Sequence, residues 1–193
     1  ELSHQTAPTI NFRLIGFEKD SIGDLLEQGE IHVALGVFPN PPRQTQWEPI
    51  FEERFVGVAR QGHPALHQGT MSLEAFAQLS HALTTLRRDT TGVIDKALNE
   101  QNLERRIALT TPHMMVLPFT IASTDLITAL PRRIALRLAP VCNLTIFELP
   151  IKTKPWMVSM LWSTLNNQDE ANRWLRDEIR AIGQKVAAST DKI

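Results

Sequence analysis

Short apolar runs alternate along the chain with segments in which apolar residues recur at helical spacing. Runs such as 31–37 (IHVALGV) and 55–59 (FVGVA) are almost continuously apolar, which is typical of strands buried on both faces of a sheet. Strands are predicted at Thr9–Phe17, Ile31–Val37, Arg54–Arg60, His81–Leu86, Arg105–Thr110, Asp125–Leu130, Leu144–Leu149 and Trp156–Trp162. Helices are predicted near 21–28, 72–79, 91–102, 112–123, 131–139 and 168–186. This order predicts an α/β fold with largely parallel sheets.

The predicted helix near 168–186 has the clearest periodicity. We expect Asn167 to cap its start, with Glu170 reaching back as in a capping box. Its apolar residues fall on one stripe: Ala171, Trp174, Leu175, Ile179, Ile182 and Val186. The other side carries charges that we expect to be solvated: Arg173, Arg176, Asp177 and Arg180.

Prolines mark two further helix starts. Thr111-Pro112 places a capping hydroxyl before a proline at the first helical position, and Leu130-Pro131 ends a strand and opens a helix in the same way. Pro118 lies inside the predicted helix 112–123, where it removes a backbone hydrogen bond. We therefore expect a kink or a division there.

Composition and charge exclude two classes of protein. Of the 193 residues, 42% are apolar and 21% charged, and the formal net charge is −1. This rules out an intrinsically disordered chain and leaves no basic excess for a free-standing nucleic-acid binder. Residues 67–155 carry ten Lys and Arg against seven Asp and Glu, a local charge of +3. This cationic middle favours an anionic small molecule as ligand, although ordinary scatter of surface charge also accounts for it.

Motifs that announce catalysis do not occur. The sequence lacks a nucleophile elbow, a phosphate-binding glycine loop and a dinucleotide fingerprint, so we expect no enzyme and no cofactor, although a composite site from distant residues stays open. His63 and His67 have the spacing of helical zinc ligands, but Gly62 and Pro64 place them in a turn, so no metal site is expected. The single Cys142 excludes an internal disulfide and favours a reducing compartment.

Targeting signals are also lacking. No apolar run is long enough to span a membrane, and the first residues show neither a cationic start nor an apolar core. A mature exported protein would already have lost its signal, so that alternative stays open.

Four stretches, in order along almost the whole chain, resemble the effector-binding domain of LysR-type transcriptional regulators. Residues 26–36 (LEQGEIHVALG) resemble the family segment L-x-x-G-x-I-D-x-A-[LI], with His32 where Asp is usual. Residues 51–56 (FEERFV), followed by GHP at 62–64, resemble the strand and turn that leave the first lobe. TDLITALP at 124–131 is similar to the branch that contains NodD and the regulators of aromatic-compound degradation. So is the closing helix, with Trp162, Asp169, Ala171, Trp174, Leu175 and Arg176.

The resemblance implies two Rossmann-like lobes joined by two crossover strands, similar to type 2 periplasmic binding proteins. Lobe one would comprise 1–62 and 159–193, truncated at its N-terminal side, and lobe two 63–158. The family's winged helix-turn-helix DNA-binding domain would be missing from this chain, which would contact DNA only through that domain. The resemblance also implies a cytoplasmic homodimer or homotetramer that does not bind membranes, and a small organic effector, anionic or aromatic, held between the lobes.

Candidate effector-binding residues lie where predicted strands end. Thr111, Pro112 and His113 begin a predicted helix, where a hydroxyl, backbone N–H groups and an imidazole favour an anion, unless they form only a helix cap. Leu86 and Arg87 end another strand, and the Arg87 guanidinium suits a carboxylate, although it equally suits an exposed surface.

Two aromatic residues complete the set. Phe38 follows a buried strand and could stack on an aromatic ligand or simply pack under the loop 39–42, and Trp156 lies near the second crossing. A solute-binding protein of a transporter or an enzyme on the same fold are the alternatives to a regulator. The sequence upstream of Glu1 would distinguish a regulator, which has a helix-turn-helix pattern there, from a solute-binding protein, which has a signal peptide. Turnover assays would distinguish a regulator from an enzyme.

Overall fold

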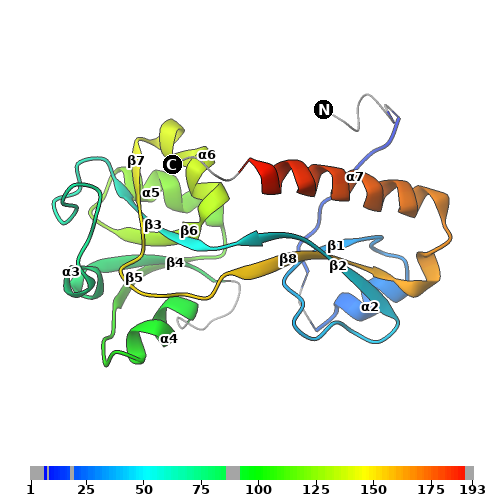
Figure 1. Cartoon of the computed structure of the whole chain (residues 1–193), viewed down its shortest axis with the longest axis horizontal. Helices are drawn as coiled ribbons and strands as arrows, with labels where there is room; N and C mark the ends of the chain where they lie inside the picture. Colours follow the sequence, from blue (N-terminus) through cyan, green and yellow to red (C-terminus); the bar gives the residue numbers. More distant parts are fainter. Residues whose placement is uncertain (1–6, 8, 18–19, 86–91, 190–193) are drawn as a thin grey trace. The chain divides into compact units, whose positions relative to one another are not determined.

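The computed structural model describes residues 7, 9–17, 20–85 and 92–189. The chain forms two compact units (Figure 1): the first is Glu1–Glu52 with Trp156–Ile193, and the second is Glu53–Pro155. The chain therefore crosses from the first unit to the second after Glu52 and returns after Pro155. The predicted boundary at residue 62 is too late, because the strand that begins at Phe55 pairs within the sheet of the second unit.

The first unit contains a three-stranded sheet in the order β1-β8-β2. Its strands are β1 (Ala34–Gly36), β2 (Thr45–Glu53) and β8 (Trp156–Ser163), with β1 antiparallel to β8. Helix α2 (Ile22–Glu27) packs on this sheet through Ile22 and Leu26. The short helix η2 (Thr164–Asn166) leads into the long helix α7 (Glu170–Ala188), which Figure 1 shows on the other side of the sheet from α2.

Two predictions for the first unit are wrong. Thr9–Phe17 is not a strand: residues 9–16 are exposed coil, and the segment contacts the rest of the unit by stacking Phe12 on Trp174 and Phe17 on Phe38. Strand β2 was not predicted, because it combines Pro49 with charged residues and lacks an apolar run. As the edge strand of its sheet, β2 accommodates a proline that a central strand would exclude.

Helix α7 also differs from its predicted pattern. Its cap is Asp169, whose carboxylate accepts the Asn172 N–H at 2.7 Å, whereas Asn167 accepts the indole N–H of Trp162 at 2.7 Å. The buried residues of α7 are Asn172, Arg176 and Gly183, not the apolar stripe, in which Ala171 and Ile182 are exposed. Two of the charges are not simply solvated either: the Arg176 guanidinium lies 5.0 Å from the Trp162 ring centroid, and Arg180 pairs with Glu48.

The second unit contains a five-stranded sheet in the order β5-β4-β6-β3-β7. Strand β4 is parallel to β5 and β6, whereas β3 is antiparallel to β6 and β7, so the sheet is mixed rather than largely parallel. The strands are β3 (Phe55–Arg60), β4 (Ser80–Thr84), β5 (Arg106–Thr111), β6 (Ile127–Pro131) and β7 (Leu144–Phe147).

Helices cover both faces of this sheet, and each face has its own core (Figure 1). Helices α3 (Leu73–Gln78) and α4 (Val93–Asn99) cover one face over a core that includes Phe76, Leu98 and Phe147. Helices α5 (Leu117–Ala122) and α6 (Arg132–Cys142) cover the other over a core that includes Val56, Leu117 and Leu130. The predicted helix 112–123 is divided, as Pro118 suggested, into a short 3-10 helix η1 (Met114–Val116) and α5.

Candidate ligand-binding cavity of the second unit

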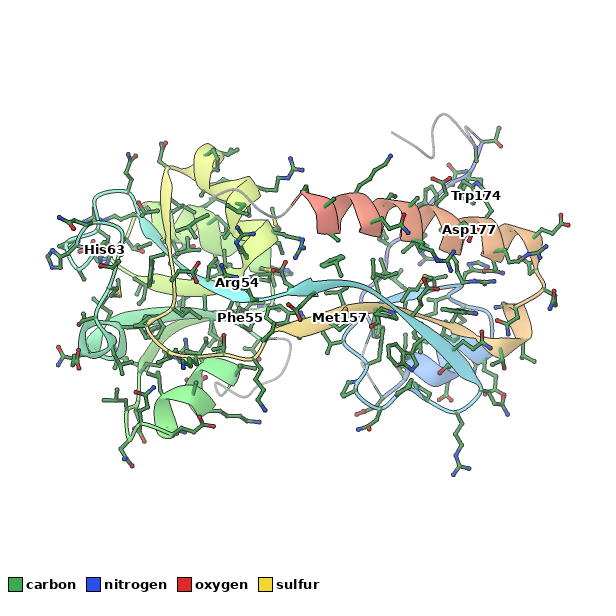
Figure 2. The ribbon with its side chains drawn as sticks, in the orientation of Figure 1. Arg54, Phe55, His63, Met157, Trp174 and Asp177 are labelled. Atoms are coloured by element: carbon green, nitrogen blue, oxygen red, sulfur yellow. The ribbon has the colours of Figure 1, made fainter. Side chains whose placement is uncertain are left out.

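One edge of the five-stranded sheet brings together the ends of several strands. The parallel strands β4 and β6 end there, and the antiparallel β3 begins there with Phe55, which pairs with Pro131 (Figure 2). Crevices at the carboxyl ends of parallel strands are where α/β sheets bind ligands. A cavity of about 200 Å³ lies at this edge, and we call it the second-unit cavity. It is lined by Phe55, Ala82, Leu83, Thr84, Gly92, Val93, Ile94, Arg105, Met114, Ala129, Leu130 and Pro131.

Most of these side chains are apolar, and one polar group among them lacks a partner. The Oγ1 atom of Thr84, at the end of β4, is buried and makes no hydrogen bond within the described part of the chain. An unsatisfied buried hydroxyl costs about 1–3 kcal/mol. A ligand in the second-unit cavity that hydrogen-bonds to Thr84 would remove this cost.

The charged group of the cavity is Arg105, which is tied to helix α4. Its side chain is 1% exposed, and its Nε and Nη2 atoms donate to the two carboxylate oxygens of Asp95 at 2.8 and 2.9 Å. Asp95 Oδ2 also accepts the N–H of Gly92 at 2.7 Å, which fixes the first turn of α4 beside the cavity. Burial acts to raise the pKa of Asp95, but the hydrogen bonds and charge of Arg105 outweigh it, so this pKa lies below its ordinary value.

His81 continues this buried network behind the cavity. Its Nε2 atom lies 2.7 Å from the carbonyl oxygen of Phe76, which can only accept, so Nε2 carries the proton and donates it. Nδ1 is then the acceptor for the Nη1–H of Arg105 at 3.2 Å. Burial, together with the nearby charge of Arg105, lowers the pKa of His81 to about 4. The imidazole is therefore neutral at pH 7.

The start of helix α6, at the same edge of the sheet, is already occupied by a carboxylate. Glu53 is buried, its Oε2 accepts the Arg133 N–H at 3.4 Å, and its Oε1 lies 3.5 Å from Arg133 Nη1. Oε1 also accepts the Arg54 N–H at 2.9 Å. A ligand anion would have to displace Glu53 to use this helix terminus.

The predicted residues at the end of β5, Thr111, Pro112 and His113, directly precede the cavity residue Met114 in the sequence but do not line the second-unit cavity themselves. The Thr111 hydroxyl accepts the His113 N–H at 3.1 Å, and both Pro112 and His113 are exposed. The following residue, Met114, borders the cavity instead. Leu86 and Arg87 lie outside the described residues.

The two predicted aromatic residues belong to the first unit. Phe38 is half-buried, stacks on Phe17 with ring centroids 6.3 Å apart and packs against the core that includes Leu26. Trp156 is half-buried at the first position of β8. Their predicted contribution to effector binding stays a prediction.

The described residues offer neither a metal site nor a membrane-spanning helix. Among them, no group of three or more His, Cys, Asp or Glu side chains is placed to hold a metal ion. His63 is buried, with Nε2 3.1 Å from the Asp125 carbonyl oxygen and Nδ1 accepting the Ala65 N–H. No helix in the described part is long and apolar enough to cross a membrane.

The two α/β units, which the chain connects by two crossings, define the class of fold: a two-lobed fold similar to that of type 2 periplasmic binding proteins. The family model of the LysR substrate binding domain matches residues 2–184. The chain belongs to this family, which confirms the resemblance that the sequence motifs indicated.

Named relatives agree with this assignment. The chain is 32% identical to the HTH-type transcriptional regulator SyrM of Rhizobium meliloti over 188 residues, which are 97% of this chain and 56% of SyrM. A probable transcriptional regulator from Pseudomonas aeruginosa is 29% identical, with a TM-score of 0.81 over 92% of this chain and 58% of that chain. The fold is shared with the effector binding domain of QuiR in complex with shikimate, at 16% identity and a TM-score of 0.67, covering 86% of this chain and 78% of that chain. This chain spans about half the length of the curated relatives it matches.

Proposed function

We propose that this chain is the effector-sensing part of a bacterial LysR-type transcriptional regulator, and that a small organic molecule in the second-unit cavity controls transcription. The observation that carries the proposal is the buried Thr84 hydroxyl, which has no hydrogen-bond partner in the described part of the chain and borders an apolar cavity at the carboxyl edge of the sheet. The family of the chain and the regulators among its relatives support this reading over a transporter's solute-binding protein.

The size and lining of the cavity support a ligand built on one ring or a short carbon skeleton. An engineered apolar cavity of about 150 Å³ holds benzene, and the second-unit cavity measures about 200 Å³. Shikimate, the molecule in the QuiR complex, is likewise built on one ring. Apolar walls such as Leu83, Ile94 and Leu130 supply hydrophobic affinity, and Thr84 fixes the orientation of one polar group.

Transmission of the signal requires that the effector bind one arrangement of the whole regulator more tightly than another, because a ligand shifts an equilibrium only by this difference. The other parts of the proposal concern the whole protein: a cytoplasmic homodimer or homotetramer that contacts DNA through a separate N-terminal domain. Enclosure of the effector between the two units stays a prediction.

A paired comparison of threonine variants tests the proposed site. A thermal-shift screen of small carboxylic acids, phenols and neutral aromatic compounds identifies a ligand, and calorimetry then measures its affinity for Thr84→Val and Thr111→Val. We expect Thr84→Val to weaken binding about fivefold, the loss of one hydrogen bond of about 1 kcal/mol. Thr111→Val should leave affinity unchanged, because its hydroxyl is engaged by His113.

The opposite order of effects would move the site to the end of β5, where the sequence predicted it. A screen that finds no ligand, or a ligand that binds both variants like the unaltered chain, would overturn the proposed site.

A further inference from the structure

We propose that the second-unit cavity selects an uncharged ligand with a hydrogen-bond acceptor over the corresponding anion, and that Asp95 sets this selection by neutralising Arg105. The inference rests on the proposed function, because it concerns the same cavity. It differs from the expectation, drawn from the cationic middle of the sequence, that the effector is an anion.

The described lining of the cavity presents no net charge to a ligand. Among the described residues that line it, Arg105 is the one ionisable side chain. Its guanidinium is held by both oxygens of Asp95, which is itself largely buried, so the pair carries no net charge. His81, the third partner, is neutral. A ligand anion therefore meets no uncompensated cation in the described lining.

Arg105 and Thr84 nevertheless supply hydrogen-bond donors for an uncharged ligand. A guanidinium has five N–H groups, and Arg105 directs three of them to Asp95 and His81. The other two make no hydrogen bond to the described residues, and Arg105 lines the cavity together with Thr84, whose hydroxyl also lacks a partner there. These groups suit a carbonyl, amide or hydroxyl oxygen on an otherwise apolar ligand, and they need no charge on it.

The corresponding anion binds at a higher free-energy cost. A carboxylate that enters an apolar cavity loses its hydration and must be paired with a cation to recover that loss. The two remaining N–H groups of Arg105 could donate to it, but they belong to an ion pair without net charge, so the anion gains an unneutralised cation only by displacing Asp95. That exchange would leave Asp95 buried without its partner and would remove the carboxylate that caps the Gly92 N–H. The Asp95–Arg105 ion pair therefore lowers the affinity of the cavity for anions.

Two nearly isosteric probes, benzamide and benzoate, test this selection by calorimetry on the full chain. We expect the unaltered chain to bind benzamide about tenfold tighter than benzoate, because only the benzoate charge would be buried unpaired. Asp95→Asn should reverse the order, since the amide oxygen can still cap Gly92 while the charge of Arg105 becomes available. Asp125→Asn is the matched control: it removes an exposed carboxylate that pairs with Arg60, and it should leave the preference unchanged.

A second variant keeps the inference testable if Asp95→Asn does not fold. The double variant Asp95→Asn/Arg105→Gln removes both charges, and we expect it to retain the preference for benzamide. Tighter binding of benzoate than of benzamide by the unaltered chain would overturn the inference while leaving the proposed function in place. The same holds if neither probe binds but the screen for the proposed function yields another ligand. If that screen yields none, the proposed function and the inference both fall.

Discussion

At the scale of single residues, the buried His81 makes the stability of the second unit depend on pH. Its pKa is lowered to about 4 from an ordinary value of 6.5. Between these two pH values, the His81 imidazole binds a proton in the unfolded chain but not in the folded chain. The stabilising contribution of neutral His81 is therefore fully present above pH 6.5 and is lost as the pH falls towards 4.

We expect acid unfolding of the unaltered chain to show this loss, at most about 1.4 kcal/mol per pH unit within that window. His81→Gln should flatten the dependence, because an amide can donate to Phe76 and accept from Arg105 without titrating. Thermal melts at a series of pH values measure the difference, and His67→Gln, at an exposed histidine, is the control. Equal pH slopes for His81→Gln and the unaltered chain would show that His81 does not titrate as described.

The hydrogen-bond network of His81, Arg105 and Asp95 could not be predicted from the sequence. Asp95 and Arg105 are ten positions apart, one in a helix and the other just before a strand, and no local spacing indicates that they pair. Thr84 lies within the predicted strand His81–Leu86, where nothing in the sequence singles it out. Only the three-dimensional structure shows that the Thr84 hydroxyl has no hydrogen-bond partner among the described residues. The candidate residues were taken from strand ends: Arg87 lies outside the described residues, Thr111 does not line the cavity, and Thr84 and Met114 do.

At the scale of elements, the sheet of the second unit depends on the close approach of β3 and β7. Gly57 on β3 pairs with Phe147 on β7, and a Cβ atom at position 57 would lie 2.3 Å from the Phe147 ring. The ring is buried in the core under α3 and α4, so it has little room to move. Gly57 is therefore required by packing rather than by backbone conformation.

We expect Gly57→Ala to destabilise the chain by about 1–3 kcal/mol, the usual cost of overpacking a core. Gly16→Ala is the matched control, because a Cβ at that exposed position meets no atom within 4 Å. Chemical denaturation of both variants measures the free energy of unfolding. Similar stabilities for the two would mean that Phe147 can turn away from β3.

The elements that sequence predicted best are those whose apolar pattern coincides with burial. Strand β3 was predicted within one residue, since its apolar side chains are buried on both faces of the sheet. Strand β2 was missed because an edge strand tolerates Pro49 and charged residues. Thr9–Phe17 has strand-forming side chains but makes no ladder hydrogen bonds, and pairing partners cannot be read from a single segment.

At the scale of the whole molecule, motif order identified the family although no motif was specific alone. The chain contributes a first unit from both of its ends and a second from a continuous segment, so every described residue of the cavity comes from Glu53–Pro155. This arrangement places the proposed binding event within one unit. Signal transmission in the whole regulator then depends on how binding in that unit changes the equilibrium of the full protein.

Methyl NMR on the full chain locates the binding event most directly. With isotope-labelled Ile, Leu and Met methyl groups, addition of benzamide is predicted to shift the signals of Leu83, Ile94 and Met114, which line the second-unit cavity. The signals of Ile22 and Leu26, in the core of the first unit, should stay unchanged. Saturable shifts confined to the first unit, or no shift at the three cavity residues with any compound that stabilises the chain, would contradict the assignment of the effector site to this cavity.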